Sequence, residues 1–108
     1  MKTIFHQIID GEIPSEKLHE DDLCIAIKDV NPVAEEHYLV IPKQTIPDLQ
    51  SAREEDKQLM GHLMLVAAKL TEGRDFRLVV NSGKEVGQTV FQLHLHVLSG
   101  REFSWPPG

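Results

Sequence analysis

The stretch FQLHLHVLSG, residues 91–100, decides the fold, because polar and apolar side chains alternate along it. Successive side chains of a strand point to opposite faces of a sheet. Gln92, His94 and His96 are therefore expected to share one face, while the large apolar residues between them share the other. The pattern predicts a strand over residues 89–98 with one buried face and one face that carries imidazoles.

Shorter elements precede this strand. TIFHQII, residues 3–9, is typical of a short helix, and the apolar spacing after Ser51 predicts a long one. Ser51 and Glu54 match a capping box, which places the start of the long helix at Ser51. Apolar runs bounded by turn residues predict further strands at residues 16–20, 23–29, 37–42 and 76–80. We therefore expect an α+β domain with a five-stranded, mainly antiparallel sheet, one long helix and one short helix.

Length and composition are those of an ordinary globular protein. The 108 residues suit one domain that spans 1–108, and 41% hydrophobic with 26% charged residues argues against disorder. The formal net charge is -6, and no cluster of Lys and Arg stands out, so we expect no extended nucleic-acid surface. A small anionic ligand is still compatible with this balance, because backbone N–H groups can bind it.

The sequence also bears on the compartment. The start of the chain does not read as a signal peptide, and no run approaches the roughly 18 apolar residues of a membrane helix. Cys24 is the only cysteine, which excludes an internal disulfide and agrees with a reducing compartment. It alternates with large apolar residues, so we expect it to be buried. These observations predict a soluble, cytoplasmic protein that does not bind membranes.

The row of imidazoles is compatible with two chemistries. With His37 from another strand, His94 and His96 can ligate zinc. Alternatively, one neutral imidazole attacks phosphorus while its neighbour orients the phosphate. The loop NSGKEVGQT, residues 81–89, directly precedes the predicted strand, and its glycines can expose N–H groups to an anion. This loop is not a Walker loop, because Lys84 is followed by Glu85.

The heptapeptide QLHLHVL, residues 92–98, resembles the signature of the histidine triad (HIT) nucleotide-binding proteins, in which three histidines alternate with apolar residues. The resemblance runs almost end to end and points to the purine nucleoside phosphoramidase branch. It implies a HIT-like fold, a homodimer with a continuous sheet, and hydrolysis of adenosine or guanosine phosphoramidates to AMP or GMP without a cofactor or metal. The segments that carry it are residues 4–22, 27–32, 37–43, 61–64, 79–101 and 105–108.

The resemblance also implies roles for single residues. His94 is the nucleophile that forms a covalent nucleotidyl-histidine, His96 binds the phosphate, His37 completes the cluster and Thr89 contacts the leaving group. Trp105 of a partner chain approaches the same group. Further nucleotide contacts are implied for Ile4, Phe5, Ile8, Ile27, Asp29, Val30, Asn81, Gly87, Gln88 and Val90.

Simpler interpretations of some of these residues remain open. Ile4, Phe5 and Ile8 are core residues about as readily as a base-binding surface. Asp29 can fix the turn before Asn31 with a hydrogen bond to the backbone.

Gln92 departs from the family pattern, because the first histidine of the triad is expected there. An amide donates and accepts hydrogen bonds and can orient a neighbouring imidazole, but it does not titrate. Since the central histidine is present, we expect an enzyme. The alternative is a purine-nucleotide-binding module with weak or no catalysis.

Overall fold

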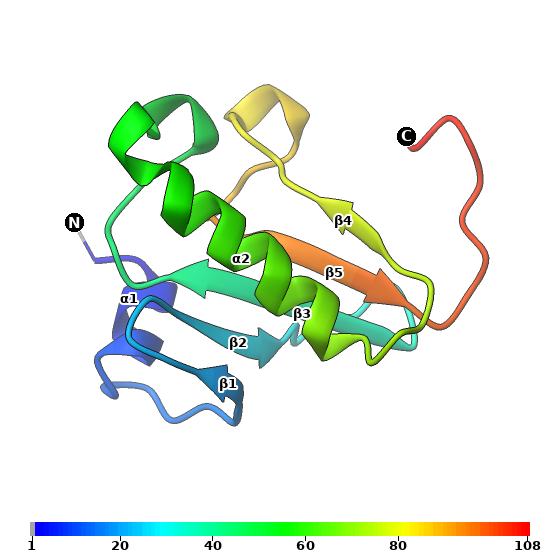
Figure 1. Ribbon diagram of the computed structural model, residues 1–108, viewed down its shortest axis with the longest axis horizontal. Coiled ribbons are helices and arrows are strands. Elements are labelled where there is room, and N and C mark those ends of the chain that lie inside the picture. The colour runs from blue at the N-terminus through cyan, green and yellow to red at the C-terminus, as the bar shows by residue number, and fades with distance from the viewer. Residues whose placement is uncertain (1) are drawn as a thin grey trace.

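Within residues 2–108, which the computed structural model describes, five antiparallel strands form one sheet in the order β1-β2-β3-β5-β4 (Figure 1). This architecture confirms the predicted α+β fold. The helices are α1 (Ile4–Ile9) and α2 (Lys57–Leu70), with short 3₁₀ turns at Leu49–Ser51, Glu54–Asp56 and Lys84–Val86. The strands are β1 (Lys17–Glu20), β2 (Cys24–Lys28), β3 (Glu36–Pro42), β4 (Arg77–Val79) and β5 (Leu95–Ser99).

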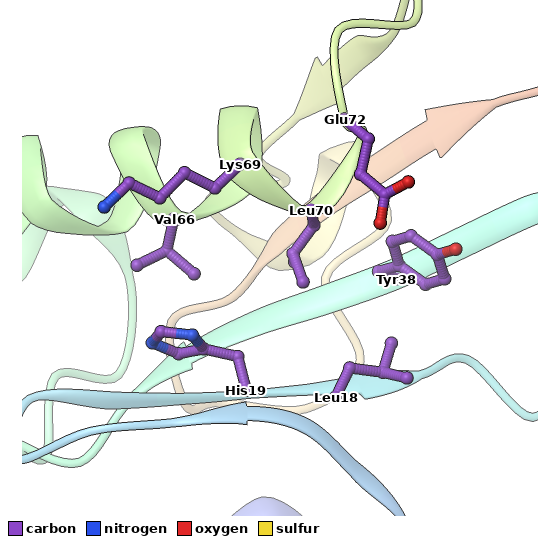
Figure 2. Close-up of a pocket in the computed structure, with 7 residues that line it drawn as sticks. All are labelled: Leu18, His19, Tyr38, Val66, Lys69, Leu70 and Glu72. Carbon is purple, nitrogen blue, oxygen red and sulfur yellow. The ribbon is translucent and has the colours of Figure 1, made fainter.

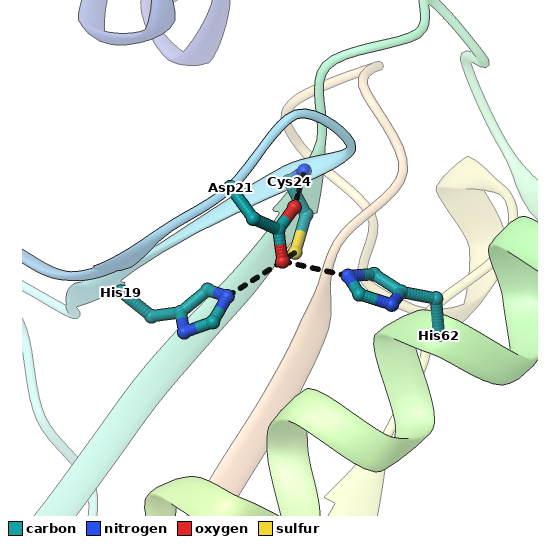
Figure 3. A group of neighbouring side chains, drawn as sticks. All are labelled: His19, Asp21, Cys24 and His62. Carbon is teal, nitrogen blue, oxygen red and sulfur yellow. Dashed lines mark hydrogen bonds and ion pairs between the residues drawn. The ribbon is translucent and has the colours of Figure 1, made fainter.

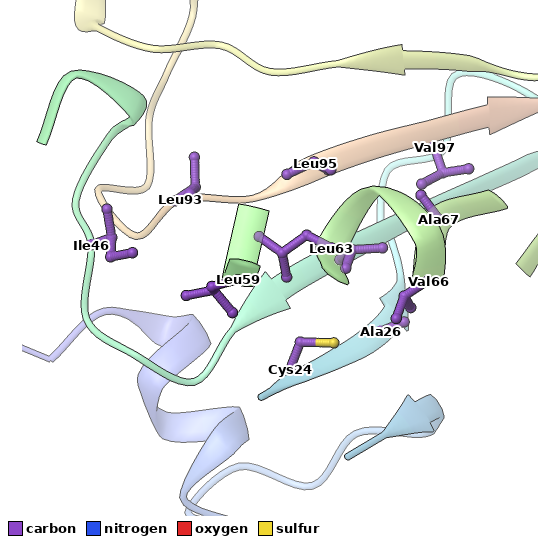
Figure 4. Packing of buried hydrophobic residues seen from close by; sticks show 11 residues of the cluster. Cys24, Ala26, Ile46, Leu59, Leu63, Val66, Ala67, Leu93, Leu95 and Val97 are labelled. Carbon is purple, nitrogen blue, oxygen red and sulfur yellow. The ribbon is translucent and has the colours of Figure 1, made fainter. Parts of the chain in front are cut away.

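Helix α2 lies across one face of the sheet (Figure 1) and packs on apolar side chains of the central strands (Figure 4). Leu63 of α2 and Cys24 of β2 are both fully buried there, which confirms the predicted burial of the cysteine. Every second residue of β5 points to this core, as the alternation predicts. The buried cluster consists of Cys24, Ala26, Val40, Ile46, Leu59, Leu63, Val66, Ala67, Leu93, Leu95 and Val97.

Helix α1 covers part of the opposite face. Thr3 caps it, because its hydroxyl accepts from the N–H of His6 while the His6 ring accepts from the N–H of Thr3. The helix buries Phe5 and Ile8, which confirms the expected apolar face. These two side chains pack in a second cluster with Ile25, Ile27, Leu39 and Ile41.

Strand register brings distant histidines to this second face. Strand β5 lies between β3 and β4, and His96 pairs with Leu39 on one side and Val79 on the other. Paired residues point to the same face, and His37 precedes Leu39 by two positions, so it points there as well. The sheet therefore places His37 beside His96, although 59 positions separate them in the chain.

Helix α2 begins later than predicted. The capping box at Ser51 and Glu54 is not formed, because the Ser51 N–H and hydroxyl both donate to the carboxylate of Asp48 and the chain makes 3₁₀ turns before Lys57. Asp56 closes the second of these turns by accepting from the N–H of Arg53. Within residues 2–108, no helix is long and apolar enough to cross a membrane.

Strand β5 also begins later than the predicted residue 89, at Leu95. The preceding residues pair with the loop after β3 rather than with a strand. The N–H of Leu93 donates to the carbonyl of Ile46 at 2.7 Å, and the N–H of Ile46 donates to Oε1 of Gln92 at 3.1 Å. The Gln92 side chain takes part in this pairing, and a periodic pattern of apolar residues cannot reveal that.

Stability should depend on the face of α2 that contacts the sheet. Leu63 is 0% exposed, so Leu63→Ala leaves a cavity and should lower the free energy of unfolding by about 3 kcal/mol. Leu65 is 65% exposed on the same helix, and Leu65→Ala should change it by less than about 1 kcal/mol. Urea unfolding of both variants measures the difference. Equal losses would contradict the assigned faces of α2.

Candidate active site

A cavity of about 460 Å³ opens on the face of the sheet that carries α1. Its walls come from α1, the end of β2 with the following turn, β3, the loop before β5, and β5 itself. It therefore gathers residues from both ends of the sequence. The site residues predicted from the sequence that line it are Ile4, Phe5, Ile8, Ile27, Asp29, Val30, His37, Asn81, Gly87, Thr89, Val90, His94 and His96.

The His94 ring is fixed by a main-chain group. Its Nδ1 lies 2.7 Å from the carbonyl oxygen of Gln92. A carbonyl only accepts, so Nδ1 carries the proton and donates it, and the neutral ring keeps a free lone pair on Nε2. Phe5 packs edge-on against the ring, with centroids 4.9 Å apart. His94 thus lines the cavity as a buried imidazole whose tautomer leaves Nε2 available as a nucleophile.

His37 and His96 form a chain of hydrogen bonds that also begins at the main chain. The N–H of Val33 donates to Nδ1 of His37 at 3.1 Å, so the proton of the neutral His37 ring is on Nε2. This Nε2 lies 2.8 Å from Nδ1 of His96 and donates to it. The neutral His96 ring therefore carries its proton on Nε2. The rings of His94 and His96 consequently differ, since His94 offers a lone pair and His96 offers a donor.

Burial favours the neutral forms of these rings. It lowers the pKa of His96 from the ordinary 6.5 to about 4, the charges of His94 and His37 act in the same direction, and Asp29 opposes them. Burial likewise lowers the pKa of His37, against the opposing charge of Asp29. Near neutral pH the hydrogen-bond chain described above is therefore the dominant state of these two rings.

Gln92 does not act through its side chain on either ring. The side chain is 0% exposed, and Nε2 donates to the carbonyls of Pro42 and Gln44 at 3.0 and 2.8 Å. Its Oε1 accepts from Ile46. The orienting role expected of the amide belongs instead to the main-chain carbonyl of the same residue, because the side chain is turned toward the loop after β3. Any residue at this position supplies that carbonyl.

Asp29 serves both the turn and the histidine cluster. Its Oδ1 accepts from the N–H of Asn31 at 2.8 Å, which is the turn-fixing bond that the sequence left open as an alternative. Its Oδ2 lies 3.3 Å from Nε2 of His37. Asp29, His37 and His96 each present a ligand atom within 4.8 Å of the others, so these three residues can meet around a cation. This set differs from the zinc ligands expected from the sequence, because Asp29 takes the place of His94.

The loop before β5 uses two of its expected phosphate-binding amides internally. The N–H of Gly87 donates to Lys84 and that of Gln88 donates to the carbonyl of Gly83. The Gln88 side chain is buried and braces the loop by accepting from the N–H of Gly83 and donating to the carbonyl of Val90. Gln88 therefore does not line the cavity, although Gly87 does.

Two further amides of this loop lie beside the cavity. Within residues 2–108, no main-chain carbonyl accepts from the N–H of Thr89 or Val90. Both residues line the cavity, so their N–H groups are candidate donors to an anion there.

Some cavity residues escaped the sequence analysis. Leu39 shares the face of His37 by strand alternation, which could have identified it. Lys28 and Asn31 flank the predicted Asp29 and Val30. Val33 contributes its N–H, and a main-chain donor has no signature in a sequence. Trp105 lies outside this cavity on the C-terminal segment and is 81% exposed, so its contact across a dimer stays a prediction.

Comparisons with known proteins agree with this geometry. The family model described as HIT domain matches residues 10–103. An uncharacterized HIT-like protein of Synechocystis is 60% identical over 98% of this chain and 96% of its own length. The crystal structure of a HIT family hydrolase from Legionella pneumophila has a TM-score of 0.95 at 38% identity, covering 99% of this chain and 100% of that one.

A more distant relative of known structure carries a nucleotide-binding description. The crystal structure of a histidine triad nucleotide-binding protein from Candida albicans has a TM-score of 0.81 at 29% identity, covering 99% of this chain and 85% of that one. The family model and the 60% identical relative each span most of the present sequence. The chain therefore belongs to the HIT domain family, as the resemblance of residues 92–98 predicted.

Proposed function

We propose that the protein is a purine nucleoside phosphoramidase, which hydrolyses the P–N bond of adenosine or guanosine 5′-phosphoramidates. The observation that carries the proposal is the pair of opposed tautomers, with a lone pair on Nε2 of His94 beside a proton on Nε2 of His96. A nucleophile next to a donor for phosphate oxygens is what a covalent nucleotidyl transfer requires. The description of the Legionella relative as a hydrolase supports the same class.

The reaction proceeds in two displacements. Nε2 of His94 attacks the α-phosphorus, the N–P bond to the imidazole forms, and the P–N bond to the leaving amine breaks. The amine nitrogen takes up a proton from solvent. Water then attacks phosphorus, the bond to His94 breaks, and AMP or GMP leaves with release of a proton. The Gln92 carbonyl stabilises the positive charge that develops on the ring, because it already accepts its Nδ1–H.

Other cavity residues suit the remaining parts of a nucleotide. His96 donates to a non-bridging phosphate oxygen, with help from the amides of Thr89 and Val90. The base lies against the apolar side chains of the cavity, among which Ile4 and Val30 are exposed. The Asp29 carboxylate accepts from the ribose hydroxyls. The same apolar side chains take adenine or guanine, since they contact the faces of the base.

A homodimer fits the surface of the chain. Met64 and Leu65 leave an apolar strip exposed on α2, and β4 is an edge strand that can pair with a second copy. In such a dimer the exposed Trp105 of one protomer reaches the leaving-group side of the other.

His94→Ala tests the nucleophile. The variant should lose turnover of an adenosine phosphoramidate by at least about a thousandfold, because no other ring of the cluster has an aimed lone pair. It should still bind AMP, and rapid quenching should trap a nucleotidyl-protein only in the parent chain. Gln58→Ala, which alters an exposed side chain of α2 outside the cavity, serves as the control. Undiminished turnover in His94→Ala would refute the role, and AMP binding without any trapped intermediate in the parent would leave a nucleotide-binding module.

Gln92→Ala separates stability from chemistry. It removes the partners of three main-chain groups at the end of β3 and in the following loop, two of them buried, so the free energy of unfolding should fall by about 2–4 kcal/mol. Turnover per folded molecule should change by less than about tenfold, because the carbonyl that holds His94 remains. Urea unfolding and steady-state kinetics measure the two effects, and Gln50→Ala provides an exposed glutamine as control. A loss of turnover as large as that of His94→Ala would place the Gln92 side chain in the reaction.

Acid should destabilise the protein through His96. Its pKa is about 4 in the folded chain against 6.5 ordinarily, so between these values the unfolded chain binds a proton that the folded chain does not. The free energy of unfolding should therefore fall as the pH falls from 6.5 toward 4, and His37 adds to the effect. Urea unfolding across this range should give a shallower slope for His96→Asn than for the parent or for Gln58→Ala, which alters an exposed side chain that does not titrate. Identical slopes would contradict the neutral ring.

A further inference from the structure

A second group of ligating side chains lies on the opposite face of the sheet from the histidine site. His19 comes from β1, Asp21 from the turn of the β1–β2 hairpin, Cys24 from the start of β2 and His62 from α2 (Figure 3). Their ligand atoms all lie within 4.8 Å of one another. We refer to these four residues as the hairpin cluster. Cys24 belongs to the core under α2, whereas the cavity of His94 lies on the α1 face.

Asp21 is the centre of the hairpin cluster. Its Oδ1 accepts from the N–H groups of Leu23 and Cys24 at 2.7 and 2.9 Å, which fixes the orientation of the carboxylate. Its Oδ2 is turned toward the other members and lies 2.7 Å from Nε2 of both His19 and His62 (Figure 3). Outer hydrogen bonds that orient a ligand in this way are typical of metal sites.

The charges and burial of the hairpin cluster suit a cation that enters from solvent. Burial alone raises the pKa of Asp21, but hydrogen bonds from His19, the main chain and His62 outweigh it and hold this pKa below its usual range. The carboxylate is therefore ionised. The side chains of His19, Asp21 and His62 are 32, 29 and 33% exposed, so the open side of the cluster faces water. Cys24 closes the inner side, with its sulfur 3.8 Å from Oδ2 of Asp21.

A groove next to the hairpin cluster gives access to it. The His19 ring lines this groove of about 340 Å³, which lies between β1, β3 and the end of α2 and is flanked by Lys69 and Glu72 (Figure 2). The opposite charges of these two residues leave no strong local barrier to a cation. An ion or water can therefore reach the imidazole without movement of the main chain.

We propose that the hairpin cluster is a zinc site. Two imidazole nitrogens, a carboxylate oxygen and one sulfur make a four-ligand set of the kind that binds Zn²⁺ tetrahedrally. Ligand atoms about 2.0–2.3 Å from zinc lie about 3.3–3.7 Å from one another, so the imidazoles need to move outward by less than about 1 Å. Burial raises the pKa of the Cys24 thiol to about 12, and the charge of a bound ion would offset this by stabilising the thiolate. The bound ion ties α2 to the β1–β2 hairpin.

The test uses the full chain, stripped of metal with a chelator and then titrated with Zn²⁺ or Co²⁺ alone. Zinc at about 100 times its Kd should raise the Tm by roughly 10 °C. Cobalt should produce a tetrahedral visible spectrum and a thiolate-to-cobalt charge-transfer band. Because Cys24 is the only cysteine, that band reports this site and not the group formed by Asp29, His37 and His96.

Single-residue variants show which side chains bind the metal. The charge-transfer band measures cobalt binding in each variant. His62→Asn should weaken this binding at least about a hundredfold, whereas His37→Asn should leave the band unchanged. Turnover should be equal in the zinc-loaded and chelated protein at a temperature below the unfolding of both, because the hairpin cluster lies across the sheet from His94. This result is independent of which substrate the histidine site takes.

Three results would overturn the zinc site. The first is an unchanged Tm of the parent chain with zinc in excess, which would leave the hairpin cluster as a hydrogen-bonded carboxylate between two imidazoles. The second is a cobalt complex of the parent without the thiolate band, a measurement that requires no variant to fold. The third is a band that survives in His62→Asn and disappears in His37→Asn.

Discussion

The chemistry of the cavity depends on the hydrogen bond from Nδ1 of His94 to the main-chain carbonyl of Gln92. It selects the tautomer that leaves Nε2 of His94 unprotonated. The acceptor belongs to the backbone just before β5, so its position follows from the antiparallel pairing of that strand with β3 and β4. The orientation of the proposed nucleophile is therefore set by the fold rather than by a neighbouring side chain. This explains how a HIT domain can carry glutamine at the first position of its triad.

The two faces of the sheet differ in what they carry, because one holds the main core and the other holds the histidine cavity. On the α2 face, alternate residues of β5 join the main core, and the hairpin cluster lies at its margin. On the α1 face, the intervening residues His94 and His96 line a cavity together with apolar side chains of α1 and β2. A sheet only one layer thick keeps the two sites apart without a second domain. The strands of the sheet lie between the two groups of residues, so a structural change in one group would act on the other through these strands.

Sequence patterns identified the sheet and both helices, because alternation and helical spacing report burial directly. The resemblance to HIT proteins supplied most of the residues that line the cavity. Sequence patterns failed where a side chain formed hydrogen bonds that the pattern of apolar residues does not report. Ser51 does not cap α2, because its N–H and hydroxyl donate to the carboxylate of Asp48. Gln92 pairs with the loop after β3, so the regular strand starts only at Leu95. The hairpin cluster was missed for a related reason, because His19 and His62 become neighbours only when α2 packs on the hairpin.

The chain of donors from Val33 through His37 to His96 has a consequence for the entropy of the reaction. Main-chain groups of Val33 and Gln92 hold the His37 and His94 rings, and His37 in turn holds His96, before any ligand binds. The three rings lost their rotamer freedom when the chain folded. Binding of a nucleotide in the proposed reaction therefore does not carry this entropic cost a second time. Preorganisation of this kind lets a domain of 108 residues hold the proposed reacting groups in place before a ligand binds.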